Sequence, residues 1–144
     1  MPPFTQDRKA EALKRAPLFA SLSKKELRLL ASMSDDLEVE AGKVLCKEGQ
    51  IGREFFLIVE GKVDVTRKGK QVKRGGGDEF FGEIAVIEDV PRTATVTAKT
   101  PLRVIVLTSR DFRRLVEASP SVESKVLRSL ARRLLELSND PALG

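Results

Sequence analysis

Residues 81–96 read FGEIAVIEDVPRTATV, and they place two opposite charges, Glu83 and Arg92, in a mostly apolar stretch. Gly82 allows the backbone to turn sharply and to approach a ligand closely. Residues 83–88 are expected to form one short helical turn, whose free N–H groups and positive dipole end favour an anion. The guanidinium fork of Arg92 can hold two oxygens of one phosphate. The segment therefore predicts a site for a small anion.

Glu83 needs a different partner, because a carboxylate and a phosphate repel each other. A ribose 2′-hydroxyl offers the hydrogen-bond donor that this carboxylate requires. The combination suits a 3′,5′-cyclic nucleotide, which carries one phosphate charge and only that free sugar hydroxyl, whereas a linear monophosphate brings extra charge toward Glu83. The alternative interpretation is a structural ion pair between Glu83 and Arg92 that closes a turn.

Composition narrows the class of protein. The 144 residues fit one domain with its own hydrophobic core. The chain contains no histidine, which argues against most zinc and nonhaem iron sites and most serine or cysteine nucleophile systems. The 26 basic and 21 acidic residues interleave along the chain, which favours a solvated surface over a nucleic-acid face.

The chain shows no sign of secretion or of a membrane span. Cys46 is the single cysteine, so no intrachain disulfide can form, and the start MPPFTQDRKAEA lacks a secretory apolar stretch. The longest apolar run, FFLIV at residues 55–59, is much shorter than the about 20 residues that a transmembrane helix needs. We therefore expect a cytoplasmic protein.

The periodicity of the sequence predicts a mainly β protein flanked by helices. A helix is expected over residues 6–15, and another from Ser21, where Ser23 and Glu26 form a capping box. In residues 36–108, apolar and polar side chains alternate within short segments, and glycine-rich turns separate these segments. This pattern is typical of a β-sandwich or β-barrel. The expected strands are 37–40, 43–47, 55–60, 62–67, 71–74, 93–98 and 102–107. The triplet Gly75–Gly77 is interpreted as a hairpin turn, because it lacks the spacing of a nucleotide loop.

Helices are expected again after residue 108. Thr108 with Asp111 predicts an N-terminal cap, and Ser119-Pro120 predicts the start of a last helix that ends near Ser138. That helix carries leucines at helical spacing, namely Leu127, Leu130, Leu134 and Leu137. Either the helix docks on its own sheet, or its leucines form a seam with a second copy, which would give a homodimer. Residues 1–35, 36–108, 109–138 and 139–144 thus form an N-terminal helical segment, a β-domain, C-terminal helices and a tail.

The stretch at 81–96 closely resembles the phosphate-binding cassette of the cyclic nucleotide-binding domain, found in catabolite activators, protein kinase A regulatory subunits and cyclic-nucleotide-gated channels. The Phe-Gly-Glu-Ile-Ala start, the Arg-Thr-Ala end and the nine-residue step from Glu83 to Arg92 carry the likeness. The resemblance extends from about Leu18 to Leu137. It implies an eight-stranded jelly-roll-like β-roll, with the cassette at 80–96 and with C-terminal helices that move and often cover the purine.

The resemblance also implies roles for particular residues. Glu83 would bind the 2′-hydroxyl and Arg92 the cyclic phosphate, while Thr93 would reach the phosphate or the base. The other implied ligand-binding residues are Gly82, Ile84, Ala85 and Ala94, through their backbone, and Val65 and Phe81, which would line the base. Thr93 occurs in cyclic-GMP binders and in some cyclic-AMP domains of this family, and we expect cyclic AMP as the ligand.

The expected function is therefore a ligand-sensing regulatory module with no catalytic residues, no metal and no cofactor. A degenerate domain that binds protein partners without a ligand is the alternative. An enzyme is disfavoured, because hydrolysis of a cyclic phosphate would need a metal cluster or a general base, and Arg92 with Glu83 provides neither. We expect no DNA-binding domain in this chain, and the resemblance is compatible with a regulatory part of a larger channel, transporter or transcription regulator.

Overall fold

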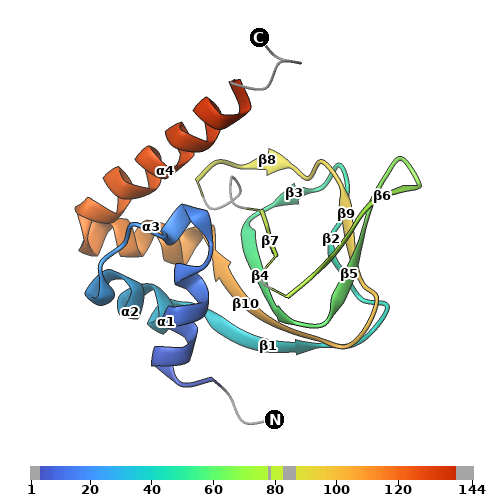
Figure 1. The fold of residues 1–144 in the computed structure, drawn as a ribbon, viewed down its shortest axis with the longest axis horizontal. Helices are drawn as coiled ribbons and strands as arrows, with labels where there is room; N and C mark the ends of the chain where they lie inside the picture. Colours follow the sequence, from blue (N-terminus) through green and yellow to red (C-terminus); the bar gives the residue numbers. More distant parts are fainter. Residues whose placement is uncertain (1–3, 78, 83–86, 139–144) are drawn as a thin grey trace.

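The structure is a computed structural model that describes residues 4–77, 79–82 and 87–138 (Figure 1). A roll of antiparallel strands forms most of the molecule, and the helices gather on one side of it (Figure 1). The predicted fold class, mainly β with flanking α, is confirmed.

The N-terminal helices are α1 (Gln6–Lys14), the 3₁₀ turn η1 (Pro17–Phe19) and α2 (Lys24–Met33). The predicted capping box of α2 is confirmed: the Ser23 hydroxyl accepts from Glu26 N at 3.1 Å, and Ser23 N donates to Glu26 Oε1 at 2.7 Å. These two bonds satisfy N–H groups that have no partner within the first helical turn. They also fix the Glu26 side chain at the start of the helix.

The roll is built from three antiparallel sheets. In chain order its strands are β1 (Asp35–Val39), β2 (Val44–Cys46), β3 (Ile51–Gly52), β4 (Glu54–Glu60), β5 (Lys62–Arg67), β6 (Lys70–Gly76), β7 (Phe80–Phe81), β8 (Val90–Pro91), β9 (Thr95–Ala98) and β10 (Leu102–Thr108). The sheet orders are β1-β10-β4-β7, β2-β9-β5-β6 and β3-β8.

The described residues thus contain ten strands rather than the eight that the resemblance implied. All seven strands expected from alternation are present, and the three additional ones, β3, β7 and β8, have two residues each. Two residues are too few to show a period of two, so alternation gave no signal for them. The hairpin turn expected at Gly75–Gly77 is partly wrong, because β6 continues through Gly75 and Gly76.

Strands β4 and β10 form the wall between two hydrophobic cores, because side chains alternate across a strand. Phe55 and Leu57 face the helices, whereas Phe56 and Ile58 face the inside of the roll. The paired residues of β10 divide in the same way. This two-sided burial explains why FFLIV reads as an uninterrupted apolar run.

Two helices follow the roll, α3 (Ser109–Ala118) and α4 (Pro120–Ser138). The Thr108 hydroxyl caps α3 by accepting from Asp111 N at 3.1 Å. Helix α4 packs on α3 and η1. Its start also joins the buried core that lies against β4 and β10, in agreement with the alternative that the helix docks on its own domain. Its later part extends away from the roll (Figure 1). Within the described residues, no helix combines the length and the apolar character needed to cross a membrane.

The side chains of α4 become more exposed along the helix. Val122 and Val126 are buried in the core between the helices and the sheet, and Leu130 packs against that core. By contrast, Leu127 is 51% exposed and Leu134 is 69% exposed. Of the leucines in the possible seam, Leu130 thus lies at the core and Leu127 and Leu134 lie on the surface, while the side chain of Leu137 is outside the described part of the structure.

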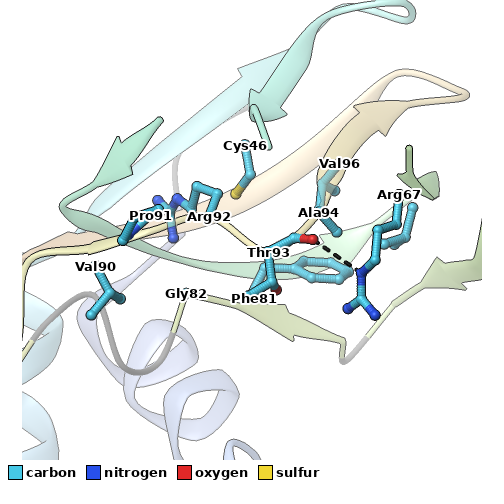
Figure 2. Close-up of a pocket in the computed structure, with 11 residues that line it drawn as sticks. Cys46, Arg67, Phe81, Gly82, Val90, Pro91, Arg92, Thr93, Ala94 and Val96 are labelled. Carbon is cyan, nitrogen blue, oxygen red and sulfur yellow. Dashed lines mark hydrogen bonds between the residues drawn. The ribbon is translucent and has the colours of Figure 1, made fainter. Parts of the chain in front are cut away.

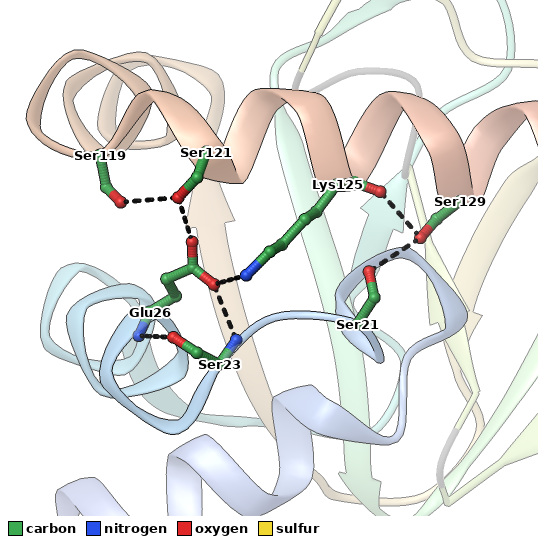
Figure 3. A network of polar contacts seen from close by, with 7 residues as sticks. All are labelled: Ser21, Ser23, Glu26, Ser119, Ser121, Lys125 and Ser129. Carbon is green, nitrogen blue, oxygen red and sulfur yellow. Dashed lines mark hydrogen bonds and ion pairs between the residues drawn. The ribbon is translucent and has the colours of Figure 1, made fainter.

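A polar network joins the start of α4 to α2 (Figure 3). The buried Glu26 carboxylate accepts from Ser121 Oγ at 2.6 Å and from Lys125 Nζ at 2.5 Å. The contact with Lys125, followed by the one with Ser121, lowers the pKa of Glu26 from 4.5 to about 2. The carboxylate is therefore charged at neutral pH and is paired on both oxygens.

Candidate functional site

One pocket of about 290 Å³ opens where the second sheet meets the segment around residue 92 (Figure 2). Its walls come from β2, β5, β7, β8 and β9 and from the residues that connect them. The lining residues are Cys46, Val65, Arg67, Phe81, Gly82, Val90, Pro91, Arg92, Thr93, Ala94 and Val96. Most of these side chains are apolar, and the two arginines bring positive charge.

The backbone of Arg92 is held on both sides. Arg92 N donates to Gln50 O at 2.8 Å, and Arg92 O accepts from Gly49 N at 2.9 Å. The adjacent pairing of β3 with β8 places Pro91 opposite Ile51. Because these contacts come from a different turn of the chain, the position of Arg92 does not depend on its own segment alone.

The Arg92 side chain is only 9% exposed and lies against β4. Its Nη2 donates to Glu54 O at 2.8 Å and lies 3.7 Å from Glu54 Oε2. The guanidinium carbon is 5.9 Å from the centre of the Phe56 ring. Among the described residues, the ion-pair partner of Arg92 is thus Glu54. A guanidinium has five N–H donors, so this pairing leaves donors for a ligand oxygen.

Two glycines make room for this guanidinium. A Cβ at Gly52 would overlap the Nε and Cζ atoms of Arg92. A Cβ at Gly82 would overlap both Arg92 Nη1 and the carbonyl oxygen of Glu54, and Gly82 has a φ of +83° that side chains rarely adopt. Gly82 was predicted to allow a close approach to a ligand, and in the structure it also leaves space for the Arg92 side chain.

We expect Gly52→Ala to lower the free energy of unfolding by about 1–3 kcal/mol, because the new methyl group overpacks the Arg92 side chain. In an Arg92→Ala background, the same substitution should cost much less, since the overlapping atoms are gone. Urea unfolding of the single and double variants measures both values. An equal loss in the two backgrounds would show that the methyl group meets something other than Arg92.

The structure brings six of the nine expected ligand-binding residues to this pocket, namely Val65, Phe81, Gly82, Arg92, Thr93 and Ala94. The other three, Glu83, Ile84 and Ala85, lie outside the described residues, as does most of the helical turn expected at 83–88. The ion pair between Glu83 and Arg92 that was weighed as an alternative lies outside them as well.

Arg67 lines the pocket although it was not among the predicted site residues. Its Nε donates to Thr93 O at 3.1 Å across the mouth of the pocket (Figure 2). Arg67 follows Val65 by two positions in β5, so the two side chains share one face of the strand. The alternation in KVDVTR therefore contained a signal for Arg67, once Val65 was assigned to the pocket.

Cys46 is buried, with 3% of its surface exposed. It also lines the pocket, next to the residues that surround Arg92 (Figure 2). Burial raises the pKa of the Cys46 thiol, and the positive charge of Arg92 acts in the opposite direction. At neutral pH this side chain therefore contributes an apolar, uncharged wall.

The pocket combines apolar side chains with the Arg92 guanidinium, which is held in place by Glu54. Such an arrangement suits a ligand with a planar apolar part and one anionic group.

Similarity to known proteins agrees with this chemistry. The family model described as "Cyclic nucleotide-binding domain" matches residues 36–119, and the chain belongs to this family.

Relatives come from several kinds of regulatory protein. The chain is 40% identical over 115 residues to the cAMP-dependent protein kinase regulatory subunit of Eremothecium gossypii, covering 77% of this chain and 24% of that one. It is 36% identical over 117 residues to a cyclic nucleotide-gated potassium channel of Rhizobium etli, covering 81% and 33%. The chain therefore spans about a quarter to a third of the length of these relatives.

A solved structure shares the fold. The N-terminal domain of a transcriptional regulator from Streptomyces coelicolor superposes with a TM-score of 0.83 at 30% identity, over 90% of this chain and 96% of that one. The match includes the helices as well as the roll, since it covers nearly the whole of both chains.

Proposed function

We propose that this domain binds a 3′,5′-cyclic nucleotide, with cyclic AMP preferred over cyclic GMP, and acts as a ligand-sensing regulatory module. The observation that carries the proposal is the buried Arg92 guanidinium, held between Gly52 and Gly82 beside an apolar pocket. Its donors suit the cyclic phosphate, and the apolar wall suits a purine. The preference for cyclic AMP is supported by the relative that is named a cAMP-dependent protein kinase regulatory subunit.

In this proposal each predicted residue keeps its role. Arg92 binds the cyclic phosphate, and the backbone of Gly82, Ile84, Ala85 and Ala94 completes the cradle. Glu83 accepts from the 2′-hydroxyl.

The remaining predicted residues contact the base. Val65 and Phe81 line it, and Thr93 contacts either the base or the phosphate. Arg67 adds a second cation at the mouth of the pocket, where its Nε is already bound to Thr93 O.

We propose that ligand binding is transmitted to the C-terminal helices. A cavity of about 310 Å³ between the cassette, residues 80–96, and these helices supports this. Ile87 of the cassette, Phe112 and Val116 of α3, and Val126 of α4 are among its lining residues. A shift of the cassette on ligand binding would change the packing here and bias the position of the helices. The ligand thus acts through contacts that differ between two positions of α4.

The proposal also includes the setting in which the domain works. We infer that the domain works in the cytoplasm, where a lone cysteine remains reduced. The exposed Leu127 and Leu134 support a homodimer through α4. The named relatives support a regulatory role within a channel or a transcription regulator. A transporter is proposed with them, and none of these roles requires catalysis by the domain itself.

Isothermal titration calorimetry with cyclic AMP, cyclic GMP and linear 5′-AMP tests the proposal. We expect cyclic AMP to bind most tightly and 5′-AMP least, because the linear phosphate brings extra charge toward Glu83. If neither cyclic nucleotide binds at high micromolar concentration, the ligand-free interaction module replaces this proposal. Chromatography of the nucleotide after long incubation would detect any hydrolysis.

Glu83→Ala should weaken cyclic AMP binding by about 1–3 kcal/mol, since the 2′-hydroxyl loses a charged acceptor. Glu88→Ala, which removes the same charge from an exposed position in the same segment, is the matched control and should change the affinity little. Calorimetry of both variants measures the difference. Equal effects of the two substitutions would mean that only the overall charge of the segment matters.

A further inference from the structure

The net positive charge of the chain is concentrated in the hairpin formed by β5 and β6. Of the 26 basic and 21 acidic residues, residues 62–74 contain six basic and one acidic, which leaves 20 of each sign elsewhere. The interleaving of charges therefore holds outside this hairpin, and the whole excess of five lies within it. A local excess of this size is an electrostatic feature of one surface, rather than of the whole molecule.

The hairpin is at the edge of the second sheet and far from the helices. Strand β6 is the terminal strand in the order β2-β9-β5-β6, and no strand among the described residues pairs with its outer edge. Residues 70–74 are all exposed. In Figure 1 the tip of the hairpin projects beyond the roll, on the side opposite α1–α4. The backbone N–H and C=O groups along this edge are thus available to another extended chain.

Most cations of the hairpin are not neutralised within the described part of the protein. Lys73 forms an ion pair with Glu79 at 2.8 Å. The one acid, Asp64, accepts from Gln71 Nε2 at 3.0 Å. The other five cations, Lys62, Arg67, Lys68, Lys70 and Arg74, form no side-chain ion pair with a described residue. A further acid, Glu48, lies at the tip of the hairpin, where its carboxylate accepts from the backbone N of Lys68 at 2.9 Å.

A depression of about 380 Å³ lies at the base of the hairpin. Three cations line it, namely Lys62, Arg74 and Lys99, together with Gly61, Val63 and the glycines Gly75–Gly77. None of the described residues that line it is acidic. The glycines bring the backbone close to its floor, and the three cations match the size and charge of one or two carboxylate groups.

We propose that β6 is a docking edge for an acidic, extended peptide segment of a partner protein. The peptide would add a strand to the outer edge of β6, and its carboxylates would face the cations of the hairpin. Nucleic acid fits less well, because residues 62–74 contain no aromatic side chain on which a base can stack. An anionic membrane also fits less well, since Val72 is the one exposed large apolar side chain of this hairpin.

The proposal does not depend on cyclic nucleotide binding, and its test uses the full chain without nucleotide. The probe is a fluorescein-labelled ten-residue peptide that alternates glutamate with threonine, followed by fluorescence anisotropy at 50 mM and 300 mM salt. We expect binding that weakens at least about tenfold at the higher salt. The same peptide N-methylated at every residue should not bind, because it cannot pair with a strand edge.

Charge reversal of the edge supplies the matched comparison. Lys70→Glu with Arg74→Glu should weaken peptide binding at least about tenfold, because four units of favourable charge difference are lost. Lys24→Glu with Lys25→Glu makes the same charge change on exposed positions of α2 and should leave the binding nearly unchanged. A second variant, Lys70→Gln with Arg74→Gln, removes the two charges without reversing them and should weaken peptide binding about threefold. Thermal unfolding verifies that each variant is folded.

Several results would overturn the proposal. No peptide binding up to millimolar concentration would mean that the lysines only protect an edge strand from pairing with other copies. Equal weakening by the α2 variant would indicate unspecific attraction, and full binding of the N-methylated peptide would exclude strand addition. Tighter binding of a ten-nucleotide oligothymidine, or of phosphatidylserine vesicles, would assign the edge to nucleic acid or to a membrane surface instead.

Discussion

Replacing Arg92 with alanine should weaken cyclic AMP binding by about 2–4 kcal/mol, or about 30- to 1,000-fold, because a charge-assisted bidentate contact is lost and the phosphate is left underpaired. Arg92→Lys should recover only part of this loss, since an ammonium cannot contact two oxygens with the same geometry. Calorimetric titration of wild type, Arg92→Ala and Arg92→Lys with cyclic AMP measures the loss of affinity in each variant.

The structure suggests a sharp control for this experiment. Arg92 also binds Glu54, so its removal changes the folded protein as well as the pocket. If Arg92 were only a structural partner of Glu54, Arg92→Ala would lower the free energy of unfolding and leave the affinity of the remaining folded protein unchanged. Arg110→Ala, which removes an exposed arginine of α3 that does not line the pocket, should change neither quantity appreciably.

Local signals in the sequence were sufficient for most of the fold. The Ser23 and Thr108 caps were predictable because each involves residues three positions apart. The longer strands were predictable because their buried faces repeat with a period of two. The two-residue strands were not, since they form only where distant turns meet, as when Ile51 pairs with Pro91.

The candidate site was predictable in its chemistry but not in its construction. The residue types at Gly82 and Arg92 indicated an anion site, and both residues do line one pocket. The contacts of Arg92 with Glu54 and Gly52 join residues about 40 positions apart, and no local pattern in the sequence indicates them. The concentration of charge in residues 62–74 was readable by counting, whereas its position on an exposed sheet edge required the structure.

The ion pair between α2 and α4 connects the stability of the domain to the proposed movement of its C-terminal helices. Glu26→Gln should lower the free energy of unfolding at pH 7 by about 2–4 kcal/mol, because the buried carboxylate loses its charge and Lys125 loses its partner. Glu117→Gln removes an exposed acid of α3 and is the matched control, with little expected effect. Urea unfolding at constant salt measures both.

The pH dependence distinguishes the charge of Glu26 from its packing. The folded-state pKa of Glu26 is lowered from 4.5 to about 2, so the stabilisation is present above pH 4.5 and is lost as the pH falls through about 2. The difference in unfolding free energy between wild type and Glu26→Gln should therefore shrink to about half its neutral value by pH 3. A difference that stays constant from pH 6 to pH 3 would contradict the ion-pair explanation.

The same substitution tests whether α4 takes part in sensing. None of the described α4 residues lines the pocket of Arg92, so Glu26→Gln cannot change cyclic AMP affinity through a direct contact of Lys125 with the ligand. If the ligand moves α4 away from α2, the wild-type affinity includes the cost of breaking the contacts of Glu26 with Ser121 and Lys125, and the variant should bind cyclic AMP several-fold more tightly. An unchanged dissociation constant in a folded Glu26→Gln protein would mean that the anchored start of α4 stays in place when the nucleotide binds, and the output would then have to leave through another part of the domain.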